Sequence, residues 1–427
     1  MPGDKSISHR AAIIASLATG PSRLRNYAFS QDCMATLACL QQLGAGVARN
    51  GSELQIESGA GFSSPARPLD CGNSGSTMRL LAGVLAGQRI AATLTGDESL
   101  RSRPMRRIIE PLALMGAEVE SKEGYPPLSI TSMGRLEGIS YELPLASAQV
   151  KSCILLAALS AGGRTEVIEQ TPTRDHTERM LHWFGAPIKI LTPADSSAKT
   201  IRIDGPVRLS PNDMSIPGDI SSAACFIAAA ALLPGSDLVL EDVGLNPTRT
   251  QFLSVLESLG AEIETDNLRE ECNEALGTLS VRGGLNVGAQ PFNRERFSQR
   301  FSLNGALIPP LIDELPLLAV VGTQLEGGIE IREAAELRVK ETDRIAATVR
   351  NLRSMGAEVE EYDDGLAVNG PARLRGAVIE PSGDHRIAMA FAIAALIAEG
   401  DSEILDPDCV NVSFPEFFAL LAGITEP

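Results

Sequence analysis

One structural unit recurs six times along this chain, and no other feature limits its fold as strongly. Each copy has an Ala-rich stretch that predicts a helix, then a Gly, an alternating strand, a polar loop and a second helix. In five copies a Gly-Ala pair follows the second helix, beginning at Gly44, Gly116, Gly185, Gly260 and Gly356. Each Gly suits the left-handed position that ends many helices, and in most copies two further strands follow.

The six copies divide equally between two halves of the chain. The phrase Pro-Gly-Asp-x-Ser occurs at residues 2–6 and again at residues 217–221, so each half opens in the same way. A length of 427 residues also favours more than one domain. The sixth copy ends with its second helix, at residues 414–421, so its closing strands would have to come from elsewhere.

Helices that alternate with strands predict an α/β or α+β fold, here made of two similar domains. The Ala-rich stretches, such as residues 223–233 and 387–398, lack a broad polar face. A helix of this kind is usually buried, so we expect these helices to lie between sheets.

The composition excludes several classes of partner. A formal net charge of −17 disfavours nucleic acid and anionic membranes. The sequence has no apolar run of the roughly 18 residues that a membrane span needs, and no signal peptide precedes the first motif. Seven Cys without paired spacing indicate reduced thiols in a cytoplasmic protein, and four dispersed His give no evident metal site.

The starts of the Ala-rich helices carry small polar residues, and four of the six also carry Lys or Arg. The first start has Lys5, Ser6 and Arg10 close together. A helix N-terminus presents free backbone N–H groups and the positive end of the helix dipole. Cations and hydroxyls added there predict a site for a phosphate or a carboxylate. The alternative is an ordinary helix cap with solvated basic residues, and Asp313 before Pro316 has the same alternative.

Polar loops supply a second set of charged residues. Arg103 lies in the loop at residues 96–104, and Arg174 lies in the loop at residues 173–177. The densest loop, at residues 337–344, contains Lys340, Glu341 and Arg344. On a helix, Lys340 and Arg344 would share one face, which is either a ligand site or a solvated, salt-bridged surface.

Taken together, these motifs resemble those of the enolpyruvyl transferase family, and in particular its shikimate branch. The stretches that carry the resemblance are residues 2–10, 72–79, 337–344 and 384–389, and the similarity extends over essentially the whole chain. The resemblance implies two domains of three βαβαββ units each, of the inside-out α/β barrel type. One domain would contain residues 4–217 and the other residues 1–3 and 218–427, with the active site in the cleft between them.

The resemblance also implies a reaction. Members of the branch transfer the enolpyruvyl group of phosphoenolpyruvate to the 5-hydroxyl of 3-phosphoshikimate and release phosphate, through a tetrahedral intermediate. They use neither a metal nor an organic cofactor, and we expect none here. We expect a monomer whose partners are these two small molecules, with no nucleic acid and no membrane.

The matching motif positions assign the site residues. The residues that would hold 3-phosphoshikimate are Lys5, Ser6, Arg10, Ser147, Ala148, Gln149, Arg174, Asp313 and Lys340. The residues that would hold phosphoenolpyruvate are Lys5, Gly75, Arg103, Gln149, Arg344 and Arg386. Asp313 matches the base for the 5-hydroxyl, and Glu341 matches the proton donor to the methylene carbon, with Lys5 as its rival.

Three positions deserve comparison with the family pattern. Asn411 stands where the family usually has Lys, which predicts weaker binding of phosphoenolpyruvate. The family normally carries a dozen or more residues before the first motif, which begins here at residue 2. Gly75 matches the small residue that lets glyphosate share the phosphoenolpyruvate site.

Two alternatives stay open at this point. The sister enzymes load enolpyruvate onto UDP-N-acetylglucosamine, but they use a Cys in a mobile loop, and the equivalent residues 97–107 contain no Cys. A catalytically impaired anion-binding relative is the second alternative, although Lys5, Asp313, Glu341 and Arg386 are all present.

Overall fold

The computed structural model describes residues 1–59, 61–131, 134–194, 196–285 and 300–425, and the chain forms two compact units. Unit 1 contains residue 1 and residues 218–269 and 275–427. Unit 2 contains residues 2–217 and, in addition, residues 270–274. Each unit has its own hydrophobic core.

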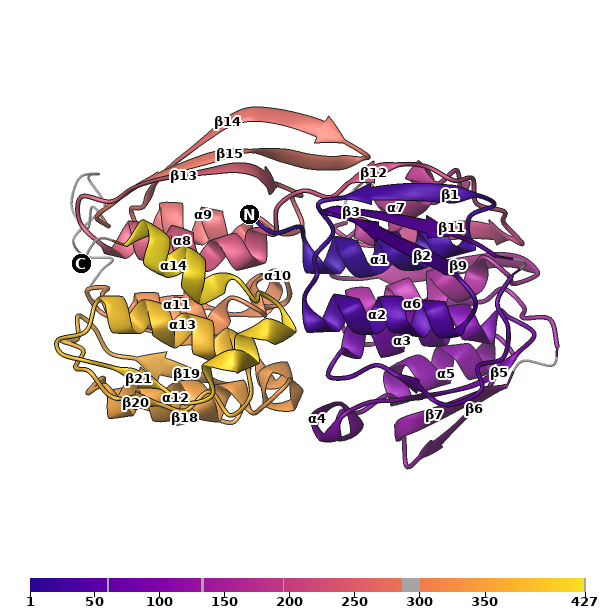
Figure 1. The fold of residues 1–427 in the computed structure, drawn as a ribbon. Helices are drawn as coiled ribbons and strands as arrows, with labels where there is room; N and C mark the ends of the chain where they lie inside the picture. The colour runs from indigo at the N-terminus through magenta and orange to yellow at the C-terminus, as the bar shows by residue number, and fades with distance from the viewer. Residues whose placement is uncertain (60, 132–133, 195, 286–299, 426–427) are drawn as a thin grey trace. The chain divides into compact units, whose positions relative to one another are not determined.

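The elements of unit 2 follow the predicted alternation of helices and strands (Figure 1). In chain order they are α1 (Lys5–Leu17), β1 (Pro21–Arg25), α2 (Gln31–Gln42), β2 (Gly46–Asn50), β3 (Glu53–Glu57), β4 (Leu69–Asp70), α3 (Gly75–Ala86), β5 (Ala91–Thr95), α4 (Glu98–Arg101), α5 (Arg106–Leu114), β6 (Glu118–Lys122), β7 (Tyr125–Thr131), β8 (Ser140–Glu142), α6 (Ala148–Ala158), β9 (Gly163–Glu169), α7 (His176–Trp183), β10 (Lys189–Leu191), β11 (Lys199–Gly205) and β12 (Met214–Ser215).

Unit 1 repeats this alternation with more short helices. Its elements are α8 (Ile220–Leu232), β13 (Asp237–Gly244), α9 (Gln251–Ser258), β14 (Glu262–Glu271), β15 (Glu274–Arg282), β16 (Phe301–Leu303), η1 (Gly305–Leu307), α10 (Ile308–Leu311), α11 (Leu315–Gly322), β17 (Ile329–Ile331), η2 (Ala335–Val339), α12 (Arg344–Ser354), β18 (Val359–Tyr362), β19 (Gly365–Val368), β20 (Val378–Ile379), α13 (His385–Leu396), β21 (Glu403–Ile404), η3 (Pro407–Val412) and α14 (Phe417–Ile424).

The three sheets of unit 2 share one design. Their strand orders are β12-β1-β3-β2, β4-β5-β7-β6 and β8-β9-β11-β10. In each sheet a strand of two or three residues pairs in parallel with the strand that follows an Ala-rich helix, and the other two strands form an antiparallel hairpin. The predicted mixed α/β class is therefore confirmed.

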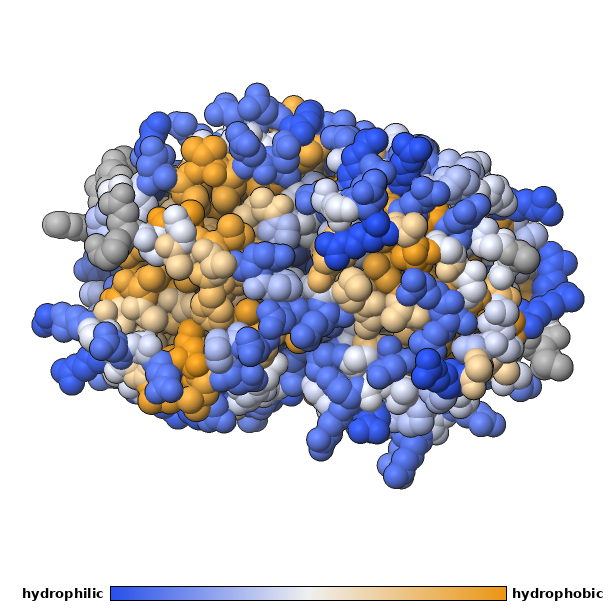
Figure 2. Space-filling view, viewed as in Figure 1, coloured by the Kyte–Doolittle hydropathy of each residue, from blue (hydrophilic) through white to orange (hydrophobic). Residues whose placement is uncertain are grey.

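Unit 1 has the same kind of sheet in β16-β17-β19-β18 and two smaller sheets, β13-β15-β14 and β20-β21. In the described residues the last sheet consists of the two strands β20 and β21, and no strand from elsewhere in these residues completes it. Val378 of β20 and Leu405, directly after β21, are 55% and 43% exposed. Figure 2 shows apolar side chains at the surface of unit 1 over α13 and α14 on the face viewed.

The Ala-rich helices are buried, as predicted. Of the 13 residues of α8, 12 are buried. In unit 2, α3 packs against both α1 and α6, and the three helices lie side by side in Figure 1. Small residues permit this approach, because a Cβ at Gly83 of α3 would lie 2.1 Å from the carbonyl oxygen of Cys153 in α6.

The Gly residues of the five Gly-Ala pairs all adopt the left-handed conformation, with φ between 85° and 101°. This confirms the predicted helix ends. Within the described residues, no single helix is long and apolar enough to span a membrane. One bent pair, Gly305–Leu311 with Leu315–Gly322, meets that test only when the two helices are joined across a 111° bend.

Candidate active site

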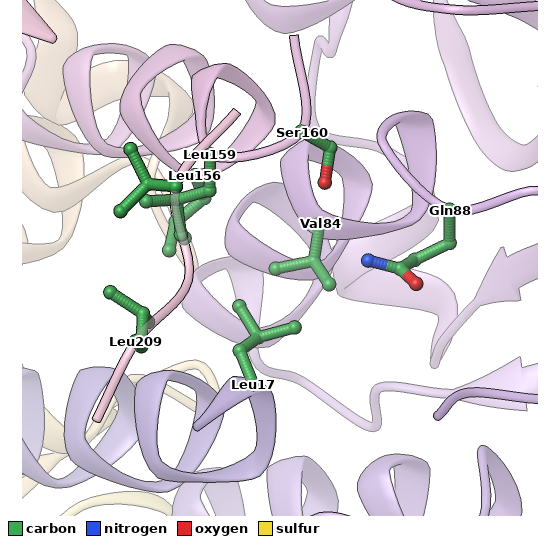
Figure 3. Close-up of a pocket in the computed structure, with 8 residues that line it drawn as sticks. Leu17, Val84, Gln88, Leu156, Leu159, Ser160 and Leu209 are labelled. Atoms are coloured by element: carbon green, nitrogen blue, oxygen red, sulfur yellow. The ribbon is translucent and has the colours of Figure 1, made fainter. Parts of the chain in front are cut away.

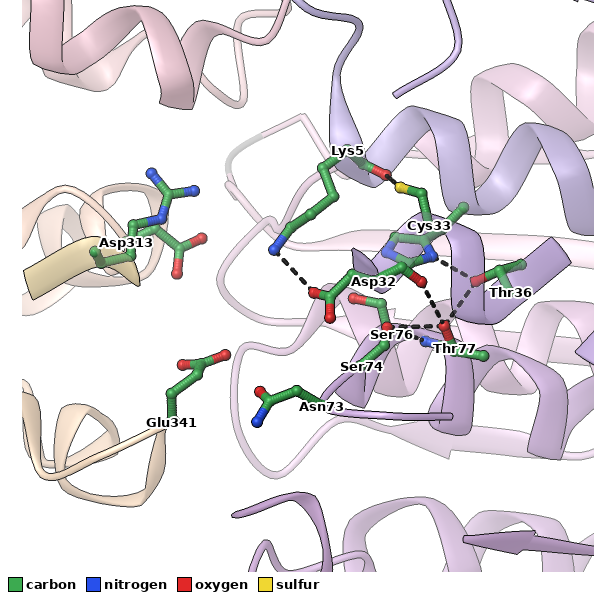
Figure 4. Close-up of polar contacts among 12 residues, drawn as sticks. Lys5, Asp32, Cys33, Thr36, Asn73, Ser74, Ser76, Thr77, Asp313 and Glu341 are labelled. Carbon is green, nitrogen blue, oxygen red and sulfur yellow. Dashed lines mark hydrogen bonds and ion pairs between the residues drawn. The ribbon is translucent and has the colours of Figure 1, made fainter. Parts of the chain in front are cut away.

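The first helix of unit 2 starts with Lys5, whose ammonium group meets a carboxylate from the next helix. Asp4 caps α1 by accepting a hydrogen bond of 2.8 Å from the backbone N–H of Ile7. Nζ of Lys5 lies 3.1 Å from Oδ2 of Asp32, in the first turn of α2 (Figure 4). The Lys5 side chain is 17% exposed, so a small anion can still reach its ammonium group.

A chain of buried hydrogen bonds joins α1, α2 and α3 next to Lys5. Nδ1 of His9 lies 2.7 Å from Oγ1 of Thr36. Figure 4 shows the next link, in which the hydroxyl of Thr36 lies 2.6 Å from Oγ1 of Thr77. Burial, and next the charge of Lys5, hold the pKa of His9 well below its usual value. His9 is therefore a neutral link between the helices, and the positive charge at this end of unit 2 comes from Lys and Arg.

Gly75 begins α3 beside Arg79 and Arg103, and Gln149 contacts the same turn of the helix. Gln149 accepts a hydrogen bond of 2.6 Å from Nη1 of Arg79 and donates one of 2.9 Å to Oγ of Ser76. A Cβ at Gly75 would lie 2.6 Å from Nη1 of Arg79 and 3.4 Å from Nη1 of Arg103. The structure thus brings three predicted phosphoenolpyruvate ligands, Gly75, Arg103 and Gln149, to the starts of α3 and α6.

Arg10 is held inside unit 2 by hydrogen bonds to three elements. Its guanidinium donates to the carbonyl oxygen of Ser6 at 2.9 Å, to Oγ1 of Thr177 at 2.7 Å and to Oγ of Ser152 at 3.0 Å. The side chain is almost fully buried, at 4% exposure. Because Thr177 lies at the start of α7, Arg10 links α1, α6 and the end of the loop that carries Arg174.

The start of α6 carries the remaining predicted acceptor ligands of unit 2. The hydroxyl of Ser147 caps the helix by accepting a hydrogen bond of 3.4 Å from the backbone N–H of Val150. Ala148 is the first helical residue, and Gln149 follows it. Backbone N–H groups in this first turn are the donors that an anionic oxygen could use.

In unit 1 a single buried guanidinium gathers three carboxylates. Arg344, the first residue of α12, is 2% exposed. It lies 2.7 Å from Asp384, 2.7 Å from Glu341 and 3.4 Å from Asp313. Burial alone would lower the pKa of Arg344, but the charges of these three carboxylates outweigh burial and raise it. The two predicted catalytic carboxylates, Asp313 and Glu341, therefore share one fixed cation.

Two roles were considered for Asp313, a catalytic base and a helix cap, and the local structure bears on the second. The helix α11 begins at Leu315, and its N-cap residue is Glu314, without a side-chain capping bond. Asp313 is thus not the N-cap that the alternative interpretation required. Asp384 does cap a helix: it accepts a hydrogen bond of 2.8 Å from the backbone N–H of Arg386 at the start of α13.

Arg386 lies at the start of α13 against α8. Its guanidinium donates a hydrogen bond of 3.1 Å to the carbonyl oxygen of Ser221 and lies 3.8 Å from Glu314. The hydroxyl of Ser221 also donates to Glu314. Arg386 is therefore linked to Glu314, the residue that follows Asp313.

The expectation that Lys340 and Arg344 share a helical face is wrong. Lys340 ends the short helix η2 with an extended backbone, and α12 begins only at Arg344, capped by Asp343. Nζ of Lys340 instead lies 3.2 Å from Glu336, one turn earlier. The capping preference of Asp at residue 343 ended the helical continuity that the spacing suggested.

Sequence reasoning missed several residues that hold the predicted ligands. Asp32 was absent from the candidate site, because an acidic residue in a first helical turn is common for helix-dipole reasons alone. Asn73 and Ser99, which accept hydrogen bonds of 2.6 and 3.1 Å from Arg103, come from two separate segments. Asn73 and Ser99 both lie in polar motifs, which was a signal that they could belong to the site. Their spacing in the sequence, however, does not pair them with Arg103.

Among the described residues, no group of three or more His, Cys, Asp or Glu could hold a metal ion. A cavity of about 100 Å³ lies at the other end of the buried helices of unit 2 (Figure 3). It is lined by residues such as Leu17, Val84 and Leu159, at the C-terminal ends of α1, α3 and α6. The predicted ligands lie at the N-terminal ends, so this cavity is not part of the candidate site.

The structure is a mixed α/β fold in which cations, hydroxyls and carboxylates gather at the starts of buried helices. Comparison with protein families matches residues 1–421 to the family described as EPSP synthase (3-phosphoshikimate 1-carboxyvinyltransferase). The chain belongs to this EPSP synthase family.

Individual relatives agree with this assignment. A 3-phosphoshikimate 1-carboxyvinyltransferase from Synechococcus sp. (strain JA-3-3Ab) is 47% identical, over all of this chain and 94% of the relative. One from Salinibacter ruber is 45% identical, over all of this chain and 96% of the relative. The solved structure of an EPSP synthase from Acinetobacter baumannii matches with a TM-score of 0.83 and 38% identity, over 99% of this chain and 94% of that one. The alternative assignment to the UDP-N-acetylglucosamine branch is therefore set aside.

Proposed function

We propose that this protein transfers the enolpyruvyl group of phosphoenolpyruvate to the 5-hydroxyl of 3-phosphoshikimate and releases phosphate, as a step of the shikimate pathway. The relatives that match it over its whole length are named for this reaction. The observation that carries the proposal is the grouping of Asp313 and Glu341 around the buried guanidinium of Arg344. This grouping supplies two carboxylates for proton transfer and a cation for an anionic substrate in one place.

Binding two multiply charged anions close together requires cations to offset their repulsion. For 3-phosphoshikimate we propose the ligands Lys5, Ser6, Arg10, Ser147, Ala148, Gln149, Arg174, Asp313 and Lys340. For phosphoenolpyruvate we propose Lys5, Gly75, Arg103, Gln149, Arg344 and Arg386. The convergence of Gly75, Arg103 and Gln149 at the starts of α3 and α6 supports the second set.

The proposed reaction is an addition followed by an elimination. Asp313 takes the proton of the 5-hydroxyl as its oxygen attacks C2 of phosphoenolpyruvate, and Glu341 gives a proton to the methylene carbon. The result is a tetrahedral intermediate that holds both the phosphate and the new ether bond. In the elimination, ionised Glu341 takes back a proton from the methyl group, and phosphate departs with the proton held by Asp313, which leaves the enolpyruvyl ether and both carboxyl groups in their starting states. In this proposal Lys5 binds the anionic groups of both substrates and stabilises the charge that develops on them.

We further propose two lobes, residues 4–217 and residues 1–3 with 218–427, each built from three βαβαββ units in an inside-out α/β barrel, with the reaction in the cleft between them. Support comes from the shared sheet design and from helices such as α8 that are buried almost completely. We also propose a cytoplasmic monomer that needs no cofactor. The seven free cysteines are consistent with a reducing compartment.

A phosphate-release assay tests the function. With phosphoenolpyruvate and 3-phosphoshikimate together, the wild-type protein should release phosphate, and with UDP-N-acetylglucosamine as the acceptor it should not. Asp313→Asn and Glu341→Gln should each lower kcat by roughly 10²- to 10⁴-fold, the range for a lost general acid or base. Lys189→Gln, on the exposed strand β10, is the matched control and should keep wild-type kcat. Release that does not depend on 3-phosphoshikimate would refute the proposal.

A further inference from the structure

A buried lysine of unit 2 has no role in the reaction as described so far. Lys151, on α6, has no exposed surface. Its Nζ lies 2.9 Å from Oε2 of Glu169, 2.6 Å from Oε1 of Glu178 and 3.5 Å from the carbonyl oxygen of Thr173. An ammonium group has three N–H donors, and each of them has an oxygen to meet here.

The two carboxylates are as deeply buried as the lysine. Glu169 and Glu178 are 1% and 2% exposed. Burial raises the pKa of Glu178, although the charge of Lys151 opposes that rise. Burial by itself would lower the pKa of Lys151, but Glu178 and Glu169 outweigh it and raise the pKa. Lys151 is therefore charged, and its ammonium group contacts three segments, namely the end of β9, the loop at Thr173 and α7.

Two of the segments that Lys151 joins carry predicted ligands of the acceptor substrate, namely the start of α6 with Gln149 and the loop with Arg174. Lys151 stands two residues after Gln149 in the first turns of α6. Thr173 precedes Arg174, and its hydroxyl also donates a hydrogen bond to Glu169, the last residue of β9. The ammonium of Lys151 thus ties the backbone immediately before Arg174 to the start of α6.

A second cross-link runs beside the first. Ser152 follows Lys151 on α6, and its hydroxyl lies 2.6 Å from that of Thr177, the neighbour of Glu178 on α7. Both hydroxyls accept hydrogen bonds from Arg10. Two adjacent residues of α6 are thus paired with two adjacent residues of α7, and the loop with Arg174 leads directly into that helix.

We propose that Lys151 is a positioning residue for the acceptor substrate, which sets Arg174 relative to the start of α6 without touching 3-phosphoshikimate. The proposal rests on the proposed function and on the assignment of Arg174 and Gln149 as ligands. An ion pair at the surface would not hold Arg174 in place, since an exposed pair contributes little to stability and leaves both side chains mobile. A buried pair fixes its partners, because separating them strands a charge away from water.

The test compares the two substrates in Lys151→Met. The KM and the Kd of 3-phosphoshikimate should rise about tenfold or more, while the KM of phosphoenolpyruvate changes less than about threefold. The Kd is measured by calorimetry with 3-phosphoshikimate alone. Lys151→Arg keeps the charge and should recover part of the affinity.

Leu155→Ala is the matched control, since Leu155 is fully buried on the same helix. It should lower the thermal unfolding midpoint and leave the Kd of 3-phosphoshikimate unchanged. Should Lys151→Met fail to fold, Thr173→Val and Glu178→Gln keep the lysine and should shift the Kd in the same direction by a smaller factor.

A folded Lys151→Met protein with the wild-type Kd would overturn the proposal, and so would an equal loss of affinity in Leu155→Ala. The proposed function fails separately, if the wild-type protein releases no phosphate in the presence of 3-phosphoshikimate.

Discussion

Replacement of Arg344 by Gln should destabilise the protein far more than the same replacement at Arg338. Both arginines contact carboxylates in unit 1. Arg338 lies 2.7 Å from Asp343 and 3.1 Å from Glu361, but its side chain is 27% exposed. The Arg344 side chain is 2% exposed and meets Asp384, which has no exposed surface. The pair of variants therefore compares a buried guanidinium with a partly exposed one that also has more than one ionic contact.

The expected magnitude follows from what each variant leaves behind. Arg344→Gln strands the Asp384 carboxylate in the interior, and loss of one partner of a buried pair costs about 3–5 kcal/mol. Glu341 and Asp313 are 18% and 21% exposed, so they can turn towards water and should add at most about 1 kcal/mol together. Arg338→Gln should cost about 1 kcal/mol or less, as partly exposed ion pairs do.

Urea unfolding followed by circular dichroism measures the difference. The free energy of unfolding should fall by about 3–5 kcal/mol for Arg344→Gln and by no more than about 1 kcal/mol for Arg338→Gln. Arg344→Lys keeps a positive charge but loses the two-pronged contact with Asp384, so it should lie between the two. Asp384→Asn in the Arg344→Gln background removes the stranded charge and should recover part of the loss.

Equal losses at Arg344 and Arg338 would refute this reasoning, because burial would then have no influence on the cost. The same conclusion would follow if Asp384→Asn deepened the loss in the Arg344→Gln background instead of relieving it. A wild-type KM of phosphoenolpyruvate in Arg344→Gln would separately contradict the proposed role of Arg344 at the phosphoenolpyruvate site.

Three further predictions concern unit 2 and the last motif. Burial lowers the pKa of His9 below its unfolded value of 6.5, so as the pH falls the unfolded chain takes up this proton first, and stability is lost below about pH 6.5. Relative to His9→Asn, the wild-type protein should lose up to about 1.4 kcal/mol per pH unit in that range by urea unfolding, and parallel pH profiles would contradict this. Gly75→Ala should raise the KM of phosphoenolpyruvate roughly tenfold, because the new Cβ meets Nη1 of Arg79 at 2.6 Å, and an unaltered KM would show that Arg79 moves aside. Asn411→Lys should lower the same KM roughly tenfold by adding a charged hydrogen-bond donor, and no change would remove Asn411 from the site.

Local signals predicted the elements of this fold well. The Gly of each Gly-Ala pair ended its helix because a residue without a Cβ adopts positive φ without strain. The Ala-rich helices were recognisable because a helix without a polar face has to be buried. The two-residue strands β4 and β12 were not predicted, since such short stretches have no periodicity to detect.

The candidate site also has a part that the sequence indicates and a part that it does not. Lys5, Arg103, Glu341 and Arg386 became candidates from motifs, because charged and hydroxyl residues at helix starts and in polar loops are visible in the sequence. The pairing of Lys5 with Asp32 was not visible, since 27 residues separate them and each has an ordinary local explanation. The helical face expected for Lys340 and Arg344 failed because a capping residue lay between them.

The sequence by itself determined the class of fold, the six recurring units and the kinds of residue available for anionic substrates, because these depend on local propensity and on side-chain chemistry. Only the tertiary structure decided which charges are buried and which carboxylates share a cation. Burial of Lys151 and Arg344 arises from segments far apart in the chain, and the energy of a charge depends on what surrounds it rather than on its neighbours in sequence.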